Sequence, residues 1–328
     1  MLNQDLKLNE KMFDKDVEKI ATRSGYGDGL VELGEKNKNV VVLSADLTES
    51  TKVNKFAEKF PERFFEMGVA EQNMAAVAAG LGVTRKTAFI SSYATFSPGK
   101  NLETLRTTTV YNNADVKIAG HHAGLMTGPD GATHQATEDL AITRSWPKMR
   151  VIVPCDYLQA KKATIYSGQK SGAFYIRFTR DNTPIMTTAL TPFVFGKAQT
   201  FWTNEKAKAV IFATGYMLYY ALLAAKELED EGLKILVTNI HTIKPIDEVT
   251  IIKQAETTDA VVTVEDHQVD GGLGSAIAEV LAKNHPTLQE FIGLQNTFGE
   301  SGKIDELLTK YKMDKNAIKK AVMKVIDR

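Results

Sequence analysis

One carboxylate, Glu71, stands in an otherwise apolar stretch and is the first candidate for chemistry. Phe64 and Phe65 precede it in a segment typical of a strand and turn, and residues 75–82 read as a buried helix that stops at glycine. Burying a carboxylate without a partner costs free energy and tends to raise its pKa, which suits an acid/base group. The local spacing fits an alternative interpretation equally well: Glu71 lies at a helix N-terminus, where a glutamate complements the helix dipole.

A glycine-punctuated loop at residues 121–135 holds the second candidate group, His121, His122, Asp130 and His134. The loop follows an apolar run that predicts a strand, and open α/β sheets bind ligands beyond the carboxyl ends of their strands. Such a segment suits an active site better than a core. Two alternatives remain: a metal site, although no helical histidine pair supports it, and a solvated loop with incidental histidines.

Two series of alternating strands and helices are expected to position these groups. Short apolar runs between helix-like segments predict an α/β fold of two domains, each a mainly parallel sheet flanked by helices. The predicted strands are residues 40–43, 87–90, 116–120, 150–154 and 173–178 in the first series and 209–215, 234–237 and 260–264 in the second. Prolines and weak periodicity after residue 182 mark the junction. The predicted domains are residues 1–187 and 188–328.

The composition argues against several classes of protein. The 328 residues include 40 basic and 40 acidic side chains, so neither nucleic acid nor an anionic membrane is predicted as a partner. A single cysteine, Cys155, excludes an internal disulfide. The polar segment 1–7 does not read as a signal peptide, and no run of about 18 apolar residues predicts a membrane span. A cytoplasmic protein is expected.

Three motifs, taken in order, resemble the C-terminal half of a transketolase. They are Gly-Val-Ala-Glu-Gln at 68–72, the loop from His122 to Gln135 with its Asp-Gly-Ala-Thr-His-Gln ending, and Thr-Arg-Asp-Asn-Thr-Pro at 179–184. Residues 21–23, 44–50 and 264–274 add weaker matches. The resemblance runs from about residue 15 to the end of the chain. It implies a thiamine-diphosphate pyrimidine-binding domain followed by a transketolase C-terminal-like domain.

The resemblance implies a cofactor role for three residues. Glu71 matches the glutamate that hydrogen-bonds the pyrimidine ring of thiamine diphosphate and so favours formation of the cofactor's own nucleophile. Tyr93 and Phe96 match the aromatic wall beside that ring, where flat apolar faces are needed. Ordinary core aromatics are the alternative interpretation of Tyr93 and Phe96.

Substrate roles follow from the resemblance in the same way. His122 and His134 match the histidines that pass protons near the substrate carbonyl and hydroxyls. Asp130 matches the carboxylate that reads a substrate hydroxyl. His121 has no clear counterpart, and one of the two adjacent histidines is open to a structural role.

A phosphate clamp is the third set of implied roles. Arg23, Ser50 and Arg180 match the residues that bind the sugar phosphate, and guanidinium groups bind phosphate oxygens bidentately. Taken singly, each arginine reads as a surface charge. Glu49 stands where many relatives have proline, and its charge would oppose a phosphate.

The resemblance also indicates what the chain lacks. Transketolases hold the diphosphate and Mg²⁺ on another domain, through Gly-Asp-Gly followed some two dozen residues later by asparagine. Gly27-Asp28-Gly29 and Asn54 approach that spacing, but no buried apolar strand precedes the triplet, so Asp28 is predicted within the first helix. The chain is expected to be one subunit of a split transketolase, with an N-terminal-type partner supplying the diphosphate and Mg²⁺ site.

The expected assembly follows from that missing half. Catalysis would occur at the interface with the partner, across large and mostly apolar contacts. Homodimerisation through the pyrimidine-binding domain and an α2β2 assembly are expected, with the second domain supporting assembly rather than chemistry. The expected reaction moves a two-carbon ketol unit from a ketose phosphate to an aldose phosphate, as in the pentose phosphate pathway.

Other functions remain open at this point. A 1-deoxyxylulose-5-phosphate synthase-like subunit shares the glutamate motif, although it typically has another residue near His122. The β subunits of 2-oxoacid dehydrogenases fit the stretch 130–135 poorly. A non-catalytic half that binds sugar phosphates is the alternative from a different class, and retention of all the motifs together weakens it.

Overall fold

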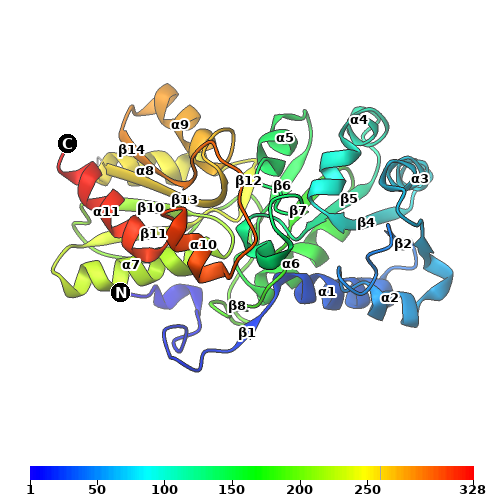
Figure 1. The fold of residues 1–328 in the computed structure, drawn as a ribbon, viewed down its shortest axis with the longest axis horizontal. Helices are drawn as coiled ribbons and strands as arrows, with labels where there is room; N and C mark the ends of the chain where they lie inside the picture. Colours follow the sequence, from blue (N-terminus) through cyan, green and yellow to red (C-terminus); the bar gives the residue numbers. More distant parts are fainter. Residues whose placement is uncertain (259) are drawn as a thin grey trace.

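The computed structural model describes residues 1–258 and 260–328, which build two sheets set side by side with helices on their faces (Figure 1). Seven strands form the larger sheet, in the order β12 (Thr242–Lys244), β6 (Arg150–Ile152), β7 (Phe174–Arg177), β5 (Val116–His121), β4 (Thr87–Tyr93), β2 (Val40–Ser44) and β3 (Phe64–Glu66). All of its pairings are parallel except that of β12 with β6. The predicted strands of the first series are therefore confirmed.

Helices cover both faces of this sheet, so its central strands are buried on both sides. One face carries α1 (Thr22–Lys36), α2 (Asn54–Lys59) and α6 (Tyr157–Gly168). The other carries α3 (Glu71–Val83), α4 (Leu102–Thr104), α5 (Asp139–Ser145) and the turns η3 (Thr95–Lys100) and η4 (Leu105–Tyr111). Strand β2 is buried along its whole length, as the unbroken apolar run 40–43 predicts.

The Gly-Asp-Gly triplet at 27–29 lies inside α1, which confirms the prediction for Asp28. Its glycines serve helix packing: a Cβ on Gly27 would stand 2.3 Å from the Lys52 carbonyl oxygen, and one on Gly29 would stand 3.1 Å from that of Lys161. The Asp28 carboxylate accepts hydrogen bonds from Lys55 Nζ and the Tyr157 hydroxyl, both at 2.7 Å. The two glycines of the triplet therefore allow close packing of α1, and the aspartate makes local polar contacts.

The smaller sheet has five strands, in the order β14 (Leu288–Leu294), β13 (Ala260–Gln268), β10 (Ala209–Ala213), β11 (Ile235–Asn239) and β9 (Gln199–Trp202). Only β9 runs antiparallel to its neighbour. The flanking helices are α7 (Met217–Asp230) and α11 (Lys315–Ile326) on one face, α8 (Glu248–Thr258) and α9 (Leu273–Asn284) on the other, and α10 (Ile304–Lys310) beyond the first pair. Both sheets are mainly parallel and covered by helices, so the predicted fold class is confirmed.

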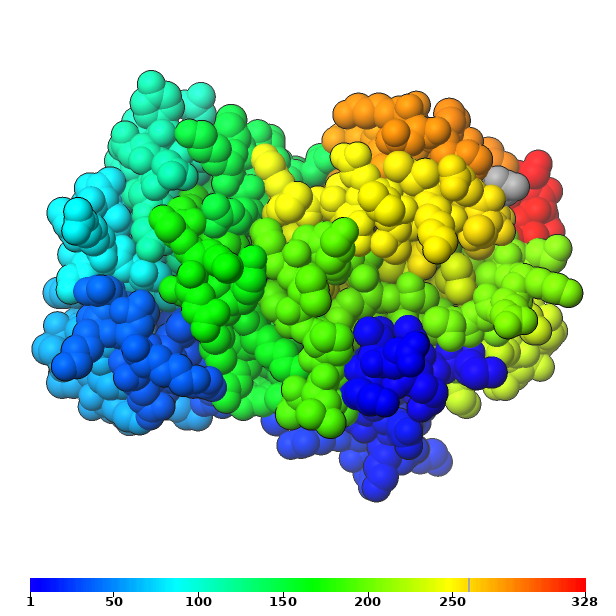
Figure 2. Space-filling model, turned by 180° about the vertical axis from the view of Figure 1, so that it is seen from behind, coloured from blue at the N-terminus to red at the C-terminus, as the bar shows by residue number. Residues whose placement is uncertain are grey.

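The two halves exchange segments of chain. Strand β12 follows the second sheet's β11 in sequence but pairs with β6 of the larger sheet. In the other direction, the N-terminal arm crosses to the smaller sheet, where Leu2 bridges to Trp202 and Met12 enters the core. Figure 2 shows this dark-blue arm seated on the C-terminal half. A ribbon of β1 (Lys19–Ile20) and β8 (Thr183–Pro184) then leads into α1. The boundary after residue 187 stays a prediction.

Membrane insertion finds no support among the described helices. Across residues 1–258 and 260–328, none combines the length and the apolar character that a bilayer crossing requires.

Candidate functional site

The candidate residues meet where parallel strands of the larger sheet end. Tyr93 is the last residue of β4 and pairs with His121, the last residue of β5. Helix α3 begins at Glu71 soon after β3, and Arg180 follows β7 within three residues. Because these strands are parallel, their carboxyl ends share one edge of the sheet, the edge at which α/β proteins bind ligands.

Glu71 is buried at the first position of α3, with 2% of its side chain exposed. Lys100 Nζ donates to Glu71 Oε2 at 2.7 Å, and the Asn101 amide donates to the Glu71 carbonyl oxygen at 3.0 Å. Lys100 is 47% exposed, so its ammonium group closes the outer side of the carboxylate. Sequence reasoning missed Lys100, since a lysine beside a glycine in a polar turn carries no local signal of this contact.

One expectation about this region is wrong. The sequence predicts residues 75–82 as a buried helix, but α3 buries only the side that packs on the sheet. Its outer side exposes Ala76, Val77, Gly80 and Val83 to solvent in the single chain, and Val69 just before the helix is 69% exposed. A helix that covers a sheet has one free face, and beyond Gln72 and Asn73 in the first turn this face of α3 is apolar and small in side-chain volume. An apolar face of this kind is typical of an interaction surface.

An aromatic group lines the site next to Glu71. The Tyr93 and His122 rings stack with centroids 3.8 Å apart and planes 20° from parallel. Phe96 lies 5.8 Å from Tyr93 in a nearly parallel plane, and His134 meets the Phe96 ring edge-on at 5.6 Å. The structure thus brings together four of the residues that the sequence singled out, from β4, η3 and the loop after β5.

The two adjacent histidines have different surroundings. His121 is fully buried between Tyr26 and Phe178, at ring distances of 5.0 Å from each. His122 lies on the Tyr93 side instead, with an unusual φ of 51°. Strand β5 ends at His121 and the chain turns at His122, so the two side chains point in different directions and His122 is the one that stacks on Tyr93. The structural alternative therefore describes His121.

Electrostatics hold His122 in its neutral form. Burial, with the positive charges of Arg23 and Arg180 nearby, lowers the pKa of His122 to about 3. At neutral pH the imidazole can therefore donate at one ring nitrogen and accept at the other. Its Nδ1 is buried and has no hydrogen-bond partner among the described residues.

The predicted phosphate residues form a positively charged corner. Arg180 Nε lies 3.5 Å from Asp130 Oδ2. The arginine predicted to bind the phosphate therefore forms an ion pair with the aspartate predicted to bind a substrate hydroxyl. Arg23 Nη1 donates to the backbone carbonyl of Ser50 at 2.8 Å, while its Nε is buried without a partner. Burial and the charge of Arg180 lower the pKa of Arg23. An anion between the two arginines would relieve this repulsion.

The donor set fits the pyrimidine end of thiamine diphosphate better than it fits a metal. The buried Glu71 carboxylate is bound by a residue of η3, the turn that carries Phe96 of the aromatic group, and Ser92 Oγ, Thr95 Oγ1 and His122 Nδ1 are buried polar atoms without a partner among the described residues. Among residues 1–258 and 260–328, no cluster of three or more His, Cys, Asp or Glu side chains is arranged to hold a metal ion.

Comparison with known sequence families finds two matches along the chain. The family described as "Transketolase, pyrimidine binding domain" matches residues 18–186, and the one described as "Transketolase, C-terminal domain" matches residues 196–318. The first match contains every candidate residue of the site.

Individual relatives and a solved structure agree with these matches. A Methanocaldococcus jannaschii protein provisionally named a transketolase C-terminal section is 44% identical, over 92% of this chain and 95% of its own length. The 6-deoxy-6-sulfo-D-fructose transketolase subunit SqwH of Clostridium sp. is 36% identical, over 96% and 98%. A structure described as a split gene transketolase, inactive beta4 tetramer, superposes with a TM-score of 0.87 at 43% identity, covering 94% of this chain and 99% of that one.

Proposed function

The chain belongs to the transketolase family, and on this premise we propose that it is the C-terminal subunit of a split transketolase. The proposed reaction transfers a two-carbon ketol unit from a ketose phosphate to an aldose phosphate. One observation carries the proposal most directly: the buried Glu71 carboxylate is bound by Lys100 of η3, the turn that also carries Phe96, and Phe96 stacks with Tyr93 at the carboxyl edge of the sheet. This chain aligns with 95% and 98% of the lengths of the two relatives described above, which supports the proposal that it is a separate subunit.

Glu71, Tyr93 and Phe96 would hold the pyrimidine ring of thiamine diphosphate. The cofactor, when bound, supplies a carbon nucleophile that adds to a ketose carbonyl. Glu71 would hydrogen-bond a ring nitrogen, and its carboxylate would have to be shared with Lys100 or released by it. Tyr93 and Phe96 would pack against the flat face of the ring and exclude water from it.

His122 and His134 would handle protons at the substrate. His122 is neutral because its pKa is held low in the free chain, so it could accept a hydrogen bond from a substrate hydroxyl at one ring nitrogen and donate one to a carbonyl oxygen at the other. His134 Nδ1 lies 2.9 Å from the Thr133 hydroxyl, a contact that orients the ring. Asp130 would accept a hydrogen bond from a substrate hydroxyl, steadied by its ion pair with Arg180.

Arg180 and Arg23 would bind the phosphate group of the sugar. The unpartnered Arg23 Nε and the mutual repulsion of the two guanidinium groups favour an anion between them. Arg180→Ala is therefore expected to raise KM for phosphorylated sugars at least tenfold, because a charge-assisted bidentate contact is lost. KM for unphosphorylated sugars should rise much less, because these sugars lose only the support that Arg180 gives to Asp130. Steady-state kinetics on matched sugar pairs measures this, and an equal effect on both types would remove the phosphate role.

A partner subunit would complete the site. The diphosphate and Mg²⁺ would be held by an N-terminal-type subunit that carries the Gly-Asp-Gly…Asn motif. The apolar outer face of α3, with Val69 beside it, adjoins Glu71 and is suited to contacts with that subunit or a second copy of this chain. A relative that forms an inactive tetramer of β chains supports both self-association and dependence on a partner.

Reconstitution tests the proposal. Ketol transfer from xylulose 5-phosphate to ribose 5-phosphate is measured with thiamine diphosphate and Mg²⁺, first with this chain alone and then with its N-terminal-type partner. Activity is expected only in the mixture. Activity of the chain alone would overturn the missing-half inference. A verified complex without transfer would reject these substrates, and pyruvate with glyceraldehyde 3-phosphate then tests the synthase-like alternative.

A further inference from the structure

Strand β13 of the smaller sheet carries three consecutive ionisable residues just before its last residue, Glu265, Asp266 and His267, each at most 2% exposed. Burial of such groups is stable only if each finds hydrogen-bond partners. Glu265 finds them inside its own half, where its carboxylate oxygens accept from the backbone N–H groups of Leu273 and Gly274 at 2.7 and 2.8 Å. The other two reach across to the larger sheet's half.

Asp266 binds the backbone of the loop that carries the site histidines. Its Oδ1 accepts from the Leu125 N–H at 2.9 Å, and its Oδ2 accepts from the Met126 N–H at 3.3 Å. The loop passes so close that a Cβ on Gly124 would stand 2.0 Å from Asp266 Oδ2. Gly124 also has a φ of 74°, which favours glycine. The loop is therefore shaped around this carboxylate.

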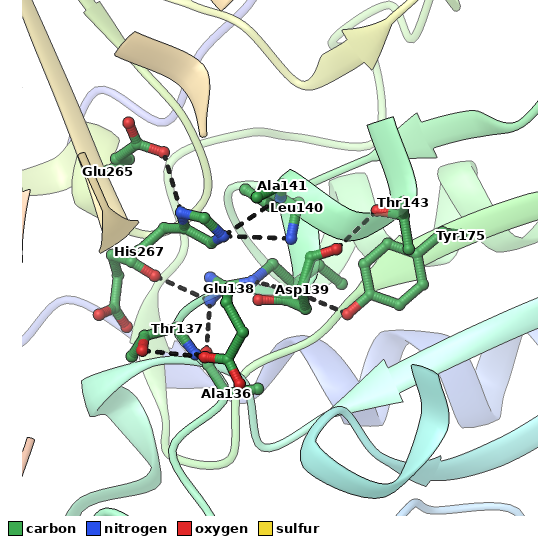
Figure 3. Close-up of polar contacts among 12 residues, drawn as sticks. Ala136, Thr137, Glu138, Asp139, Leu140, Ala141, Thr143, Tyr175, Glu265 and His267 are labelled. Atoms are coloured by element: carbon green, nitrogen blue, oxygen red, sulfur yellow. Dashed lines mark hydrogen bonds and ion pairs between the residues drawn. The ribbon is translucent and has the colours of Figure 1, made fainter. Parts of the chain in front are cut away.

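His267 and the neighbouring backbone secure the far end of the same loop. His267 Nε2 accepts from the N–H groups of Leu140 and Ala141 at 3.2 and 3.4 Å, at the start of α5 (Figure 3). Arg177 Nη2 donates to the carbonyl oxygens of Ala136 and Asp266 at 3.1 and 2.8 Å. Strand β13 thus contacts the loop where its first turn, η5 (Leu125–Asp130), begins, and again at the start of α5, just after the loop.

We propose that Asp266 is a positioning residue for the reaction, because its carboxylate holds the backbone segment that joins His122 to His134. This inference rests on the proposed function of those histidines. Through Asp266, the C-terminal half shapes the site directly, which goes beyond the assembly role that the sequence suggests for it.

A short chain of contacts links Asp266 to His122. The carboxylate fixes Leu125 and Met126, and the next residue, Thr127, donates from its hydroxyl to the His122 carbonyl oxygen at 2.6 Å. Asparagine at 266 would keep one acceptor but turn an NH₂ group toward an N–H donor. The loop start would then be released, and a shift of about 1 Å in a catalytic group can cost on the order of a hundredfold in rate.

The test compares Asp266→Asn with Glu265→Gln, a matched control. Asp266 and Glu265 both lie in β13, and each has a buried carboxylate that accepts from two backbone N–H groups. Each variant replaces one of these carboxylates by an amide, but only Asp266 binds the loop. In the reconstituted enzyme, Asp266→Asn is expected to lower kcat by tenfold to a hundredfold with a nearly unchanged apparent affinity for thiamine diphosphate. Glu265→Gln should change kcat less than threefold.

Amide hydrogen exchange of the full chain supplies a readout that does not depend on activity. Asp266→Asn should speed exchange in residues 122–136 and leave α9 unchanged, whereas Glu265→Gln should do the reverse. Faster loop exchange with no activity in any sample would count against the proposed function and not against the positioning role. Unchanged loop exchange, or an equal kcat loss in both variants, would overturn the positioning role.

A second variant covers the case in which Asp266→Asn does not fold. Gly124→Ala places a methyl group against Asp266 Oδ2 from the loop side. The same selective loss of kcat and the same faster exchange in residues 122–136 are expected. A Gly124→Ala enzyme with normal kcat would also contradict the proposal.

Discussion

Glu71→Gln is expected to lower turnover of the reconstituted enzyme by about 10²- to 10⁴-fold while leaving the fold intact. The amide is nearly isosteric with the carboxylate but cannot take part in proton transfer to or from a pyrimidine nitrogen. Loss of the ion pair should cost little stability, because the Lys100 ammonium it leaves behind is already 47% exposed to water. The measurements are kcat with saturating thiamine diphosphate and the thermal midpoint of the isolated chain.

Glu103→Gln is the matched control for this prediction. Glu103 lies in α4, close in sequence to Lys100, and its exposed carboxylate accepts only from the Thr107 hydroxyl, at 2.7 Å. Its replacement should leave turnover within twofold of the unmodified enzyme. Near-normal turnover in Glu71→Gln would eliminate the proposed role of Glu71 in cofactor activation, whatever the control does.

Arg177→Met is expected to have the largest effect on stability, a loss of about 3–5 kcal/mol in the free energy of unfolding. Arg177 Nε donates to Asp139 Oδ2 at 2.9 Å, and both side chains are at least 94% buried. Without the guanidinium group, the Asp139 carboxylate would keep only the Tyr175 hydroxyl, at 2.5 Å, and its Oδ1 already lacks a partner. Denaturant unfolding of the isolated chain measures the change.

Two further variants separate this mechanism from a general loss of packing. Arg150→Met removes an arginine that stacks on Phe174, with its guanidinium carbon 4.7 Å from the ring centroid, and should cost about 1 kcal/mol or less. The double variant Arg177→Met/Asp139→Asn removes the uncompensated charge and should recover part of the loss. If the double variant is as unstable as Arg177→Met alone, the buried charge is not the cause.

Local pattern was sufficient for much of the fold. Unbroken apolar runs such as 40–43 and 209–213 predict strands buried on both faces, and these runs lie within β2 and β10. The absence of an apolar strand before Gly27 was sufficient to place Asp28 in a helix. These features depend on neighbours within a few residues, so the sequence carries them without reference to the rest of the molecule.

The candidate site was predictable only in part, as a set of residue types in the right order. Glu71, His122 and His134 could be singled out because their segments differ from apolar or glycine-rich surroundings, whereas Tyr93 followed only from the family resemblance. Lys100 could not, since its contact with Glu71 joins residues 29 positions apart without any periodic signal. The exposed side of α3 was also missed, because an apolar face destined for an interface has the same composition as a core face.

Local pattern was therefore enough to predict the strands of the two series and to propose which side chains carry the chemistry. The tertiary structure alone decided which histidine of the pair 121–122 faces the site, where the N-terminal arm lies, and that Asp266 of the second half supports the loop of the first. The reason is physical: hydrophobic periodicity is a local property, whereas a hydrogen bond between residues 125 and 266 exists only after two sheets have packed.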